Sequence, residues 1–363
     1  MLAVLALVCI VLLYYLIFKL KIRALSNYVW LFLIGGAYVY FTLKLWKAPE
    51  EAVHFLEYGL LGFFLFRALS LNVKDKSIYV TATFFTMLVG TIDEIFQWIM
   101  PQRWWDFRDV GLNTLSGGLF QLLLLTAVKP RIITEKISAH SIKTLTTIFA
   151  VCLVLLGLCA SNTSKQVAYY TELIPGISFL REEESMSEFG YKHKDPEIGA
   201  FYSRLSLSKL KRVDEQRGKQ NAQLLNKSVQ VAYELFLRLY NPIRDPFMHE
   251  LRVHLFRRDA YFETARASSE QNIKEESYFI AYKENLIVRK YFTRSVEESV
   301  YNWGEDKVRE SESLIDVKKY YKSPVSAGLF TSFSEKGMWI TIFVVLAVLV
   351  LINFIWRFVE KRK

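Results

Sequence analysis

Long apolar runs separated by short polar connections dominate the sequence. Seven runs are long enough to be membrane helices, because about 20 apolar residues span the hydrocarbon core of a bilayer. The predicted spans are 2–18, 27–46, 52–70, 78–100, 108–128, 141–160 and 338–358. The first and last are nearly free of charge, whereas the third and fourth contain His54, Glu57, Asp93 and Glu94. The pattern predicts a polytopic α-helical membrane bundle of about seven transmembrane helices.

The stretch 161–336 is polar and has a different pattern. Apolar positions at helical spacing predict amphipathic helices over 204–217 and 220–240, with a turn at 216–219. From residue 247 the period changes to two, because Leu251, Val253 and Leu255 alternate with polar residues, which predicts a half-buried strand.

A hairpin is predicted further along this stretch. Its strands are 278–282 and 286–292, and the polar residues Lys283, Glu284 and Asn285 between them indicate the turn. Helical and strand patterns together predict an α+β domain of the usual size.

The chain therefore divides into three predicted parts. These are a six-helix transmembrane domain at 1–160, an extracytoplasmic α+β domain at 161–336, and a transmembrane helix with a short basic tail at 337–363. All three cysteines lie in predicted membrane helices, so no disulfide framework supports the soluble domain. No cofactor is predicted, because the sequence lacks a phosphate-binding loop, a CxxC pair, an HExxH motif and a nucleophile-elbow serine.

The net charge of +10 indicates membrane topology rather than nucleic-acid binding. Residues 161–336 hold 28 basic and 26 acidic side chains, so the basic excess flanks the membrane helices. Fourteen of the other basic residues fall on one predicted side: Lys19, Lys21, Arg23, Arg67, Lys74, Lys76, Lys129, Arg131, Lys136, Lys143, Arg357, Lys361, Arg362 and Lys363. By the positive-inside rule this side is cytoplasmic. We expect the N-terminus and 161–336 outside the cell membrane and the C-terminus inside.

Three polar blocks interrupt the predicted membrane helices. They are His54-Phe-Leu-Glu57-Tyr58, then Asp93-Glu94-Ile-Phe-Gln97, then a run from Pro101 to Gly118 that contains Arg103, Asp106, Asp109 and Asn113. Spacings of three and four place members of a block on one helical face. In the predicted topology all three blocks meet at the outer membrane face. Ionisable groups at this depth usually face a bundle interior or a wet cavity.

The ordered set of these motifs resembles the VanZ-like family. The resemblance rests on His54-x-x-Glu57-Tyr58, Glu94-x-x-Gln97, Pro101-x-Arg103, the two spaced aspartates, Asn113 and the glycines that follow, and it covers about residues 50–128. Gln102 departs from the family pattern, in which glycine is expected. The resemblance implies a small polytopic protein of the bacterial envelope, and the founding member of the family is tied to resistance to the glycopeptide teicoplanin. The 161–336 insert lies outside the usual family unit.

The polar residues suit two kinds of role. The candidate site comprises His54, Glu57, Tyr58, Asp93, Glu94, Gln97, Arg103, Asp106, Asp109 and Asn113. Carboxylates and histidine can ligate a divalent metal or transfer protons, and Arg103 can hold a phosphate. Alternatively, ion pairs of Arg103 with Asp106 or Glu94 lock the helices together. The sequence does not decide between these roles, nor whether the protein is an enzyme.

Two hypotheses of function follow. In the first, the outer-face cluster recognises or modifies a lipid-linked or cell-wall component. It expects an accessible pocket lined by Glu94, Arg103, Asp109 and Asn113. In the second, the protein is a non-catalytic anchor or accessory subunit of a larger membrane complex, and these residues seal one another. Membrane lipids are expected partners, other subunits would dock through 161–336, and nucleic acid is not expected.

Overall fold

The computed structural model describes the chain except residues 1, 101–102, 135, 183 and 362–363. Pro101, Gln102 and the terminal Arg362 and Lys363 therefore lie outside the described residues. The chain splits into two compact units, the first comprising Met1–Cys159 and Met338–Lys363 and the second Ala160–Gly337. Each unit is described separately below.

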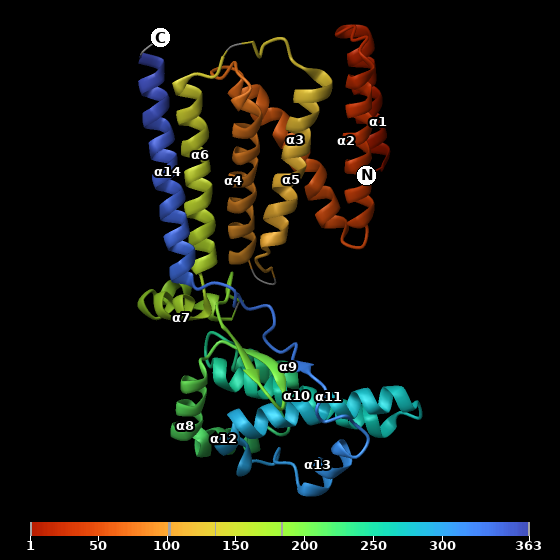
Figure 1. Ribbon diagram of the computed structural model, residues 1–363, viewed down its shortest axis with the longest axis vertical. Coiled ribbons are helices and arrows are strands. Elements are labelled where there is room, and N and C mark those ends of the chain that lie inside the picture. The colour runs from red at the N-terminus through yellow and green to blue at the C-terminus, as the bar shows by residue number, and fades with distance from the viewer. Residues whose placement is uncertain (1, 101–102, 135, 183, 362–363) are drawn as a thin grey trace. The chain divides into compact units, whose positions relative to one another are not determined.

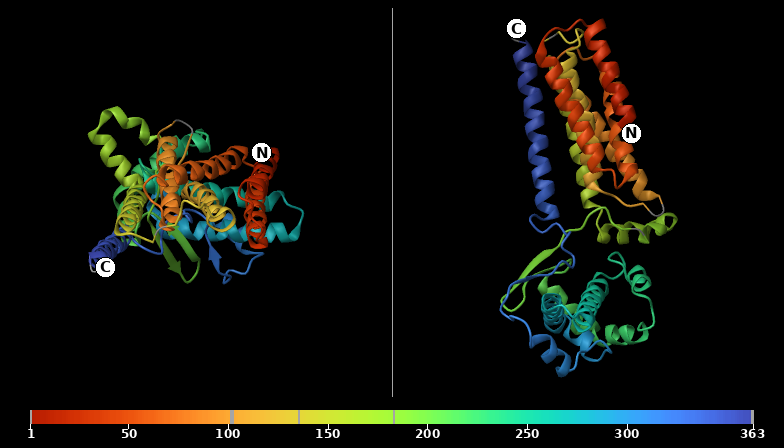
Figure 2. Two further views of the ribbon diagram at one scale, coloured as in Figure 1. Left: turned by 90° about the horizontal axis from the view of Figure 1, so that it is seen from above. Right: turned by 90° about the vertical axis from the view of Figure 1, so that its right-hand side faces the viewer.

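The first unit is helical throughout its ordered elements. Its helices are α1 (Leu2–Tyr14), α2 (Leu25–Lys44), α3 (Pro49–Leu69), α4 (Ser77–Ile99), α5 (Phe107–Leu123), α6 (Ala139–Ser161) and α14 (Glu335–Lys361), with π-helical segments η1 (Tyr15–Lys19) and η2 (Leu124–Val128). Figure 1 and Figure 2 show α4, α5, α6 and α14 side by side along one direction. Long apolar runs explain these helices, because each backbone group in lipid must be hydrogen-bonded within its own segment.

Five helices in the described chain are long and apolar enough to cross a membrane: Pro49–Leu69, Ser77–Ile99, Phe107–Val128, Ala139–Ser161 and Glu335–Glu360. The prediction of a multi-pass helical membrane protein is confirmed at this level. The remaining two predicted spans form helices α1 and α2, but the apolar part of the first is a shorter helix, Ala6–Lys19, and α2 is not among the five. The mixture of Asn, Tyr, Gly and Thr in α2 lowers its hydropathy.

Helix α5 packs closely against both α3 and α4. A Cβ atom added at Gly117 of α5 would lie 2.5 Å from Thr86 Cγ2 of α4, and one added at Gly62 of α3 would lie 3.2 Å from Gly117 Cα. Missing side chains thus let the three backbones approach, as in other membrane helix pairs. Gln121 Nε2 donates to the Gly62 carbonyl at 2.7 Å and Tyr38 OH of α2 donates to the Ser116 carbonyl at 2.6 Å. These polar contacts fix the register of α5.

Helices α6 and α14 complete the first unit on the α4 side. The rings of Phe84 in α4 and Phe149 in α6 stack with centroids 4.6 Å apart. Asn353 Nδ2 of α14 donates to Thr146 Oγ1 of α6 at 2.6 Å, and Gly157 of α6 leaves room for Ile342 of α14. A partly buried amide therefore finds its partner on the neighbouring helix instead of facing hydrocarbon.

The second unit is mainly helical and contains one small sheet. Its elements are α7 (Ser164–Leu173), the 3-10 helix η3 (Pro175–Arg181), β1 (Tyr191–Asp195), β2 (Gly199–Ser203), α8 (Leu207–Lys227), α9 (Tyr233–Leu239), α10 (Pro246–Ala267), α11 (Gln271–Tyr291), α12 (Thr293–Glu297), α13 (Glu305–Glu312) and β3 (Tyr321–Lys322). The sheet order is β1-β2-β3, with β1 antiparallel and β3 parallel to β2.

The sheet depends on a tight turn between β1 and β2. Asp195 Oδ1 accepts hydrogen bonds from Glu197 N at 2.9 Å and Ile198 N at 3.1 Å. Gly199 has φ +117°, and a Cβ atom there would lie 2.2 Å from the Tyr321 carbonyl oxygen of β3. Glycine is therefore required at this position, both for its backbone conformation and for the approach of β3.

The predicted strands at 251–255, 278–282 and 286–292 are wrong. Apart from Phe292, the C-cap of α11, they lie within the paired helices α10 and α11. In α10 the buried positions 251, 255, 258, 262 and 265 follow a helical stripe, but position 258 is an arginine, which hides the period in the sequence. The predicted turn residues Lys283, Glu284 and Asn285 are each at most 1% exposed in the middle of α11. Polarity here comes from a buried network and not from a loop.

Glu284 is the centre of that network. His254 Nδ1 lies 2.6 Å from Glu284 Oε2, and Arg257 Nε lies 3.2 Å from Oε1. The hydroxyls of Tyr321 and Ser323 donate to Oε1 at 2.6 and 2.8 Å. The carboxylate thus joins α10, α11 and the β3 segment, and each partner offsets part of the cost of burying its charge.

The turn predicted at 216–219 is also wrong, because α8 continues through it. Gly218 lies in the middle of α8, where a Cβ atom would be 2.5 Å from Arg294 Cβ. Asp214 of α8 accepts hydrogen bonds from the backbone nitrogens of Arg294 and Ser295 at 2.8 and 2.9 Å. The glycine therefore permits close packing of α12 against α8 instead of ending the helix.

Replacement of Glu284 by glutamine is expected to destabilise the second unit by about 3–5 kcal/mol, because the fully buried carboxylate that contacts His254 and the partly exposed Arg257 would be lost. Limited proteolysis of the full chain at increasing temperature, with cleavage followed inside 160–337, measures this effect. The matched control is Glu276→Gln, an exposed position on the same helix. Equal protection of both variants would contradict this role of Glu284.

Candidate functional site

A polar cavity of about 190 Å³ lies where α3 begins, α4 ends and α5 begins. Its lining consists of Glu50, Glu51, His54, Glu94, Gln97, Arg103, Trp104, Asp109, Leu112 and Asn113. In Figure 1, α4 ends and α5 begins at the same end of the first unit, where α6 also ends. Asp106 supports this local structure by accepting a hydrogen bond from Arg108 N at 2.7 Å, which caps the start of α5.

Six of the ten predicted site residues line this cavity: His54, Glu94, Gln97, Arg103, Asp109 and Asn113. Glu94 and Asn113 are the most deeply buried of these, with 3% and 4% exposure. Asn113 approaches α4 at Gly90, where a Cβ atom would be 3.2 Å from Asn113 Cβ. The small residue on α4 therefore lets the amide of α5 reach the cavity.

Gln97 connects the polar groups of α4 with the loop that follows. Its Nε2 donates to Asp93 Oδ2 at 3.1 Å and to Glu94 Oε1 at 3.3 Å, and its Oε1 accepts from Arg103 Nη2 at 2.7 Å. Arg103 therefore contacts an amide, whereas the structural alternative expected an ion pair with Asp106 or Glu94. Tyr58 OH donates to Asp93 Oδ2 at 3.2 Å, and these two residues lie outside the lining.

Two predicted residues have other surroundings. Glu57 has a side chain that is 63% exposed, and its Oε2 lies 3.7 Å from His54 Nδ1. Asp106 is the N-cap of α5, and its Oδ2 lies 3.6 Å from Arg108 Nε. Neither residue lines the polar cavity.

Sequence reasoning missed the acidic start of α3. Glu50 and Glu51 line the cavity, and Glu51 Oε1 forms a 2.5 Å ion pair with Arg108 Nη2. Arg108 also lies 3.4 Å from Asp109 Oδ1, so one guanidinium connects α3 to α5. The spacing of four between Glu50 and His54 on one helical face is a signal that could have found Glu50.

The lining is rich in hydrogen-bond acceptors. Four carboxylates line the cavity, from Glu50, Glu51, Glu94 and Asp109, whereas Arg103 is the one guanidinium among the described lining residues. No group of three or more His, Cys, Asp or Glu side chains in the described chain has the geometry to hold a metal ion. Ionised carboxylates accept hydrogen bonds only, so the cavity suits ligand groups that donate, such as hydroxyl or ammonium groups.

A second polar cavity, of about 510 Å³, lies within the unit Ala160–Gly337. Its lining includes Glu188, Arg204, His249 and Ser326, which no sequence pattern had linked. Burial, and secondarily the charge of Arg204, lower the pKa of His249 to about 4. This histidine is therefore neutral near pH 7.

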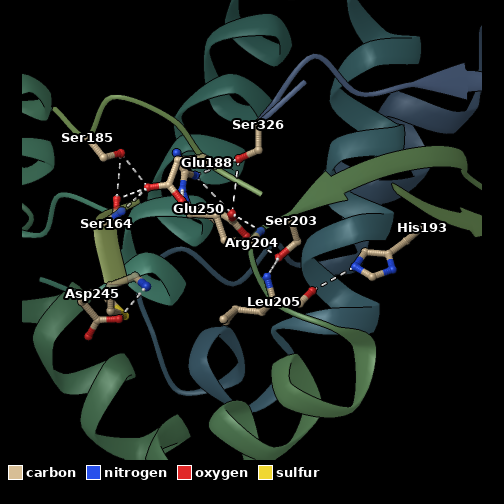
Figure 3. Close-up of polar contacts among 11 residues, drawn as sticks. Ser164, Ser185, Glu188, His193, Ser203, Arg204, Leu205, Asp245, Glu250 and Ser326 are labelled. Atoms are coloured by element: carbon tan, nitrogen blue, oxygen red, sulfur yellow. Dashed lines mark hydrogen bonds and ion pairs between the residues drawn. The ribbon is translucent and has the colours of Figure 1, made fainter. Parts of the chain in front are cut away.

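Figure 3 shows how two glutamates hold Arg204 beside this cavity. Glu250, which is fully buried, accepts from Arg204 N at 2.8 Å and from Arg204 Nη1 at 3.2 Å. Glu188 Oε2 lies 3.8 Å from Arg204 Nε, and Glu188 Oε1 accepts from Ser164 N at 3.0 Å and Ser185 Oγ at 2.8 Å. These contacts connect β2 to α10 and to the segments next to α7.

The candidate membrane helices and the cavity at their ends define a multi-pass membrane protein. A family model described as VanZ/LLP1 matches residues 4–129, so this part of the chain is a VanZ/LLP1 family region and the remainder is unassigned. The resemblance to the VanZ-like family is confirmed, and the match begins well before residue 50 and so includes α1 and α2. No curated protein and no solved structure matches the chain.

The position of α5 predicts a test of how the cavity is built. Gly117→Ala is expected to destabilise the first unit by about 1–3 kcal/mol, because its methyl group would overlap Thr86. Gly111→Ala on the same helix is the control, since a Cβ atom there meets nothing within 4 Å. Thermal unfolding in detergent compares the two, and an unchanged midpoint for Gly117→Ala would refute the close packing.

Proposed function

We propose that the polar cavity of this VanZ-family membrane protein recognises the headgroup of a lipid-linked or cell-wall component. The observation that carries the proposal is that Glu94, Arg103, Asp109 and Asn113 line an open cavity of about 190 Å³. Had they sealed one another, a purely structural role would be favoured. The ligand would enter with hydroxyl or ammonium donors toward the carboxylates.

The arrangement of donors and acceptors supports recognition. Gln97 uses both ends of its amide to hold neighbouring side chains, and Arg108 is engaged by Glu51 and Asp109. Such contacts hold the lining in place before a ligand arrives, which reduces the ordering cost of binding. Recognition needs no further chemistry, and modification of the ligand is not required by this proposal.

The charge distribution supports an extracytoplasmic location for the cavity. Arg67, Lys76 and Lys129, with the basic residues around them, lie near the opposite ends of α3, α4 and the continuous α5–η2 helix. By the positive-inside rule those ends face the cytoplasm. This proposed topology has seven membrane helices, with α1 and α2 included, and 161–336 outside the cell membrane.

An accessory subunit is the second candidate function. It is favoured by exposed apolar side chains in the Ala160–Gly337 unit, among them Leu173 at 63%, Ile174 at 53% and Phe179 at 46%. Such side chains suit a contact with a further protein subunit of a membrane complex.

The proposal predicts that Glu94→Gln and Asp109→Asn release the bound component. A charge-assisted hydrogen bond contributes about 1.5–3 kcal/mol, so each variant is expected to lose about ten-fold or more of it. Mass spectrometry of lipids retained after purification in mild detergent measures the loss. Glu360→Gln is the matched control, because Glu360 is an exposed carboxylate on α14 outside the cavity lining.

Two results would decide against recognition. In one, both variants accumulate normally and retain the same component as the unaltered chain. In the other, no component is found and a stoichiometric protein partner co-purifies. The latter result would favour the accessory subunit.

A further inference from the structure

An apolar cavity of about 370 Å³ lies in the first unit among α1, α2, α3 and α5. Its lining includes Cys9, Leu12, Ile34, Gly35, Leu60 and Phe120. Glu57, in the first half of α3, is the one charged side chain among the described residues of this lining. Walls of this kind suit hydrocarbon and not water.

The apolar and polar cavities adjoin each other along α3. His54 lines the polar cavity and Glu57 lines the apolar one, and their side chains approach to 3.7 Å. On α3 the polar lining starts at Glu50, whereas the apolar lining reaches Leu60. One helix therefore carries both linings, which overlap in the turn that contains Val53 of the apolar lining and His54 of the polar one.

The apolar cavity also lies deeper along the bundle. On α5 the polar lining ends at Asn113 and the apolar lining reaches Leu123. With a rise of 1.5 Å per residue, these ten positions correspond to about 15 Å along the helix. A polar site at a helix end, followed by an apolar site further in, matches the order of headgroup and chain in a membrane lipid.

We propose that one lipid occupies both cavities, with a hydroxyl- or amine-bearing headgroup among the carboxylates of the polar cavity and a hydrocarbon chain in the apolar cavity. This inference rests on the proposed function and makes the ligand a whole lipid instead of a soluble headgroup. Binding of the chain in the apolar cavity should therefore depend on binding of the headgroup in the polar cavity. A lipid of the general bilayer would instead occupy the apolar cavity whether or not Glu94 is present.

Two neighbouring glycines of α2 provide a matched pair of variants. A Cβ atom at Gly35 lies 3.5 Å from Cys9 Sγ, so Gly35→Phe directs its ring toward the apolar cavity that both residues line. Gly36 does not line the cavity and a Cβ atom there meets nothing within 4 Å, so Gly36→Phe is the control. Leu60→Trp fills the same cavity from α3 should Gly35→Phe fail to fold.

The probe is phosphatidylethanolamine with a photoactivatable diazirine in one acyl chain, incorporated into nanodiscs that contain the full chain. Crosslinks to α1, α2 and α3 are quantified by mass spectrometry. We expect the crosslink yield to fall about ten-fold in Gly35→Phe and equally in Glu94→Gln, and to stay unchanged in Gly36→Phe. A ten-fold loss corresponds to about 1.4 kcal/mol of binding free energy. Glycerophosphoethanolamine, the same headgroup without chains, should not compete at equal concentration.

The outcomes separate this inference from the proposed function. If Glu94→Gln alone loses the lipid, headgroup recognition stands and the two-cavity lipid is overturned. If Gly35→Phe and Leu60→Trp lose it but Glu94→Gln does not, both proposals fail, because the chain binds without the headgroup. Competition by glycerophosphoethanolamine would also overturn the inference, since the chain would then add nothing to binding.

Discussion

The close packing of α5 between α3 and α4 is the constraint on which the polar cavity depends. Gly117 removes a side chain at the contact with Thr86, and Gly90 removes one where Asn113 meets α4. In lipid no hydrophobic driving force brings helices together, so small residues and interhelical hydrogen bonds must do so. Once these backbones approach, the polar ends of three helices are forced into one small volume.

The composition of that volume then limits its chemistry. Its carboxylates outnumber the guanidinium group of Arg103, and Arg108 outside the lining offsets part of the excess. A fully paired cluster would mainly hold helices together, whereas this one keeps acceptors available around an open space. Donor groups of a ligand can supply hydrogen bonds to these carboxylates. Because a buried carboxylate without a donor is costly, the cavity favours ligands that carry such groups.

The sequence predicted the membrane unit far better than the second unit. Membrane helices are recognised in a sequence by their length and apolarity. The polar motifs at their ends are costly in lipid, so they are expected in the bundle interior or in a wet cavity. In the second unit the same rules failed, because Arg258, Lys283 and Glu284 are buried in helices and read as loop or strand positions. The β1–β2 hairpin was missed, although Asp195-Pro196 and Gly199 are turn signals.

The sequence also could not predict which site residues line the same cavity or which side chain contacts Arg103. Which of two neighbouring residues lines a cavity depends on helix rotation, so His54 and Glu57 were grouped although they line different cavities. The hydrogen-bond partner of Arg103 could not be predicted either, because Gln97, Asp106 and Glu94 are all close to it along the chain. In the structure the partner is Gln97. Spacing predicts a shared face, and only tertiary contacts choose among its members.

An experimental structure of the full chain in lipid nanodiscs tests the central claim most directly. Continuous density from a headgroup beside Glu94 and Asp109 into the space between Gly35 and Leu60 is the predicted result. A closed site, in which Arg103 pairs with Glu94 and no ligand density separates α3 from α5, would contradict it.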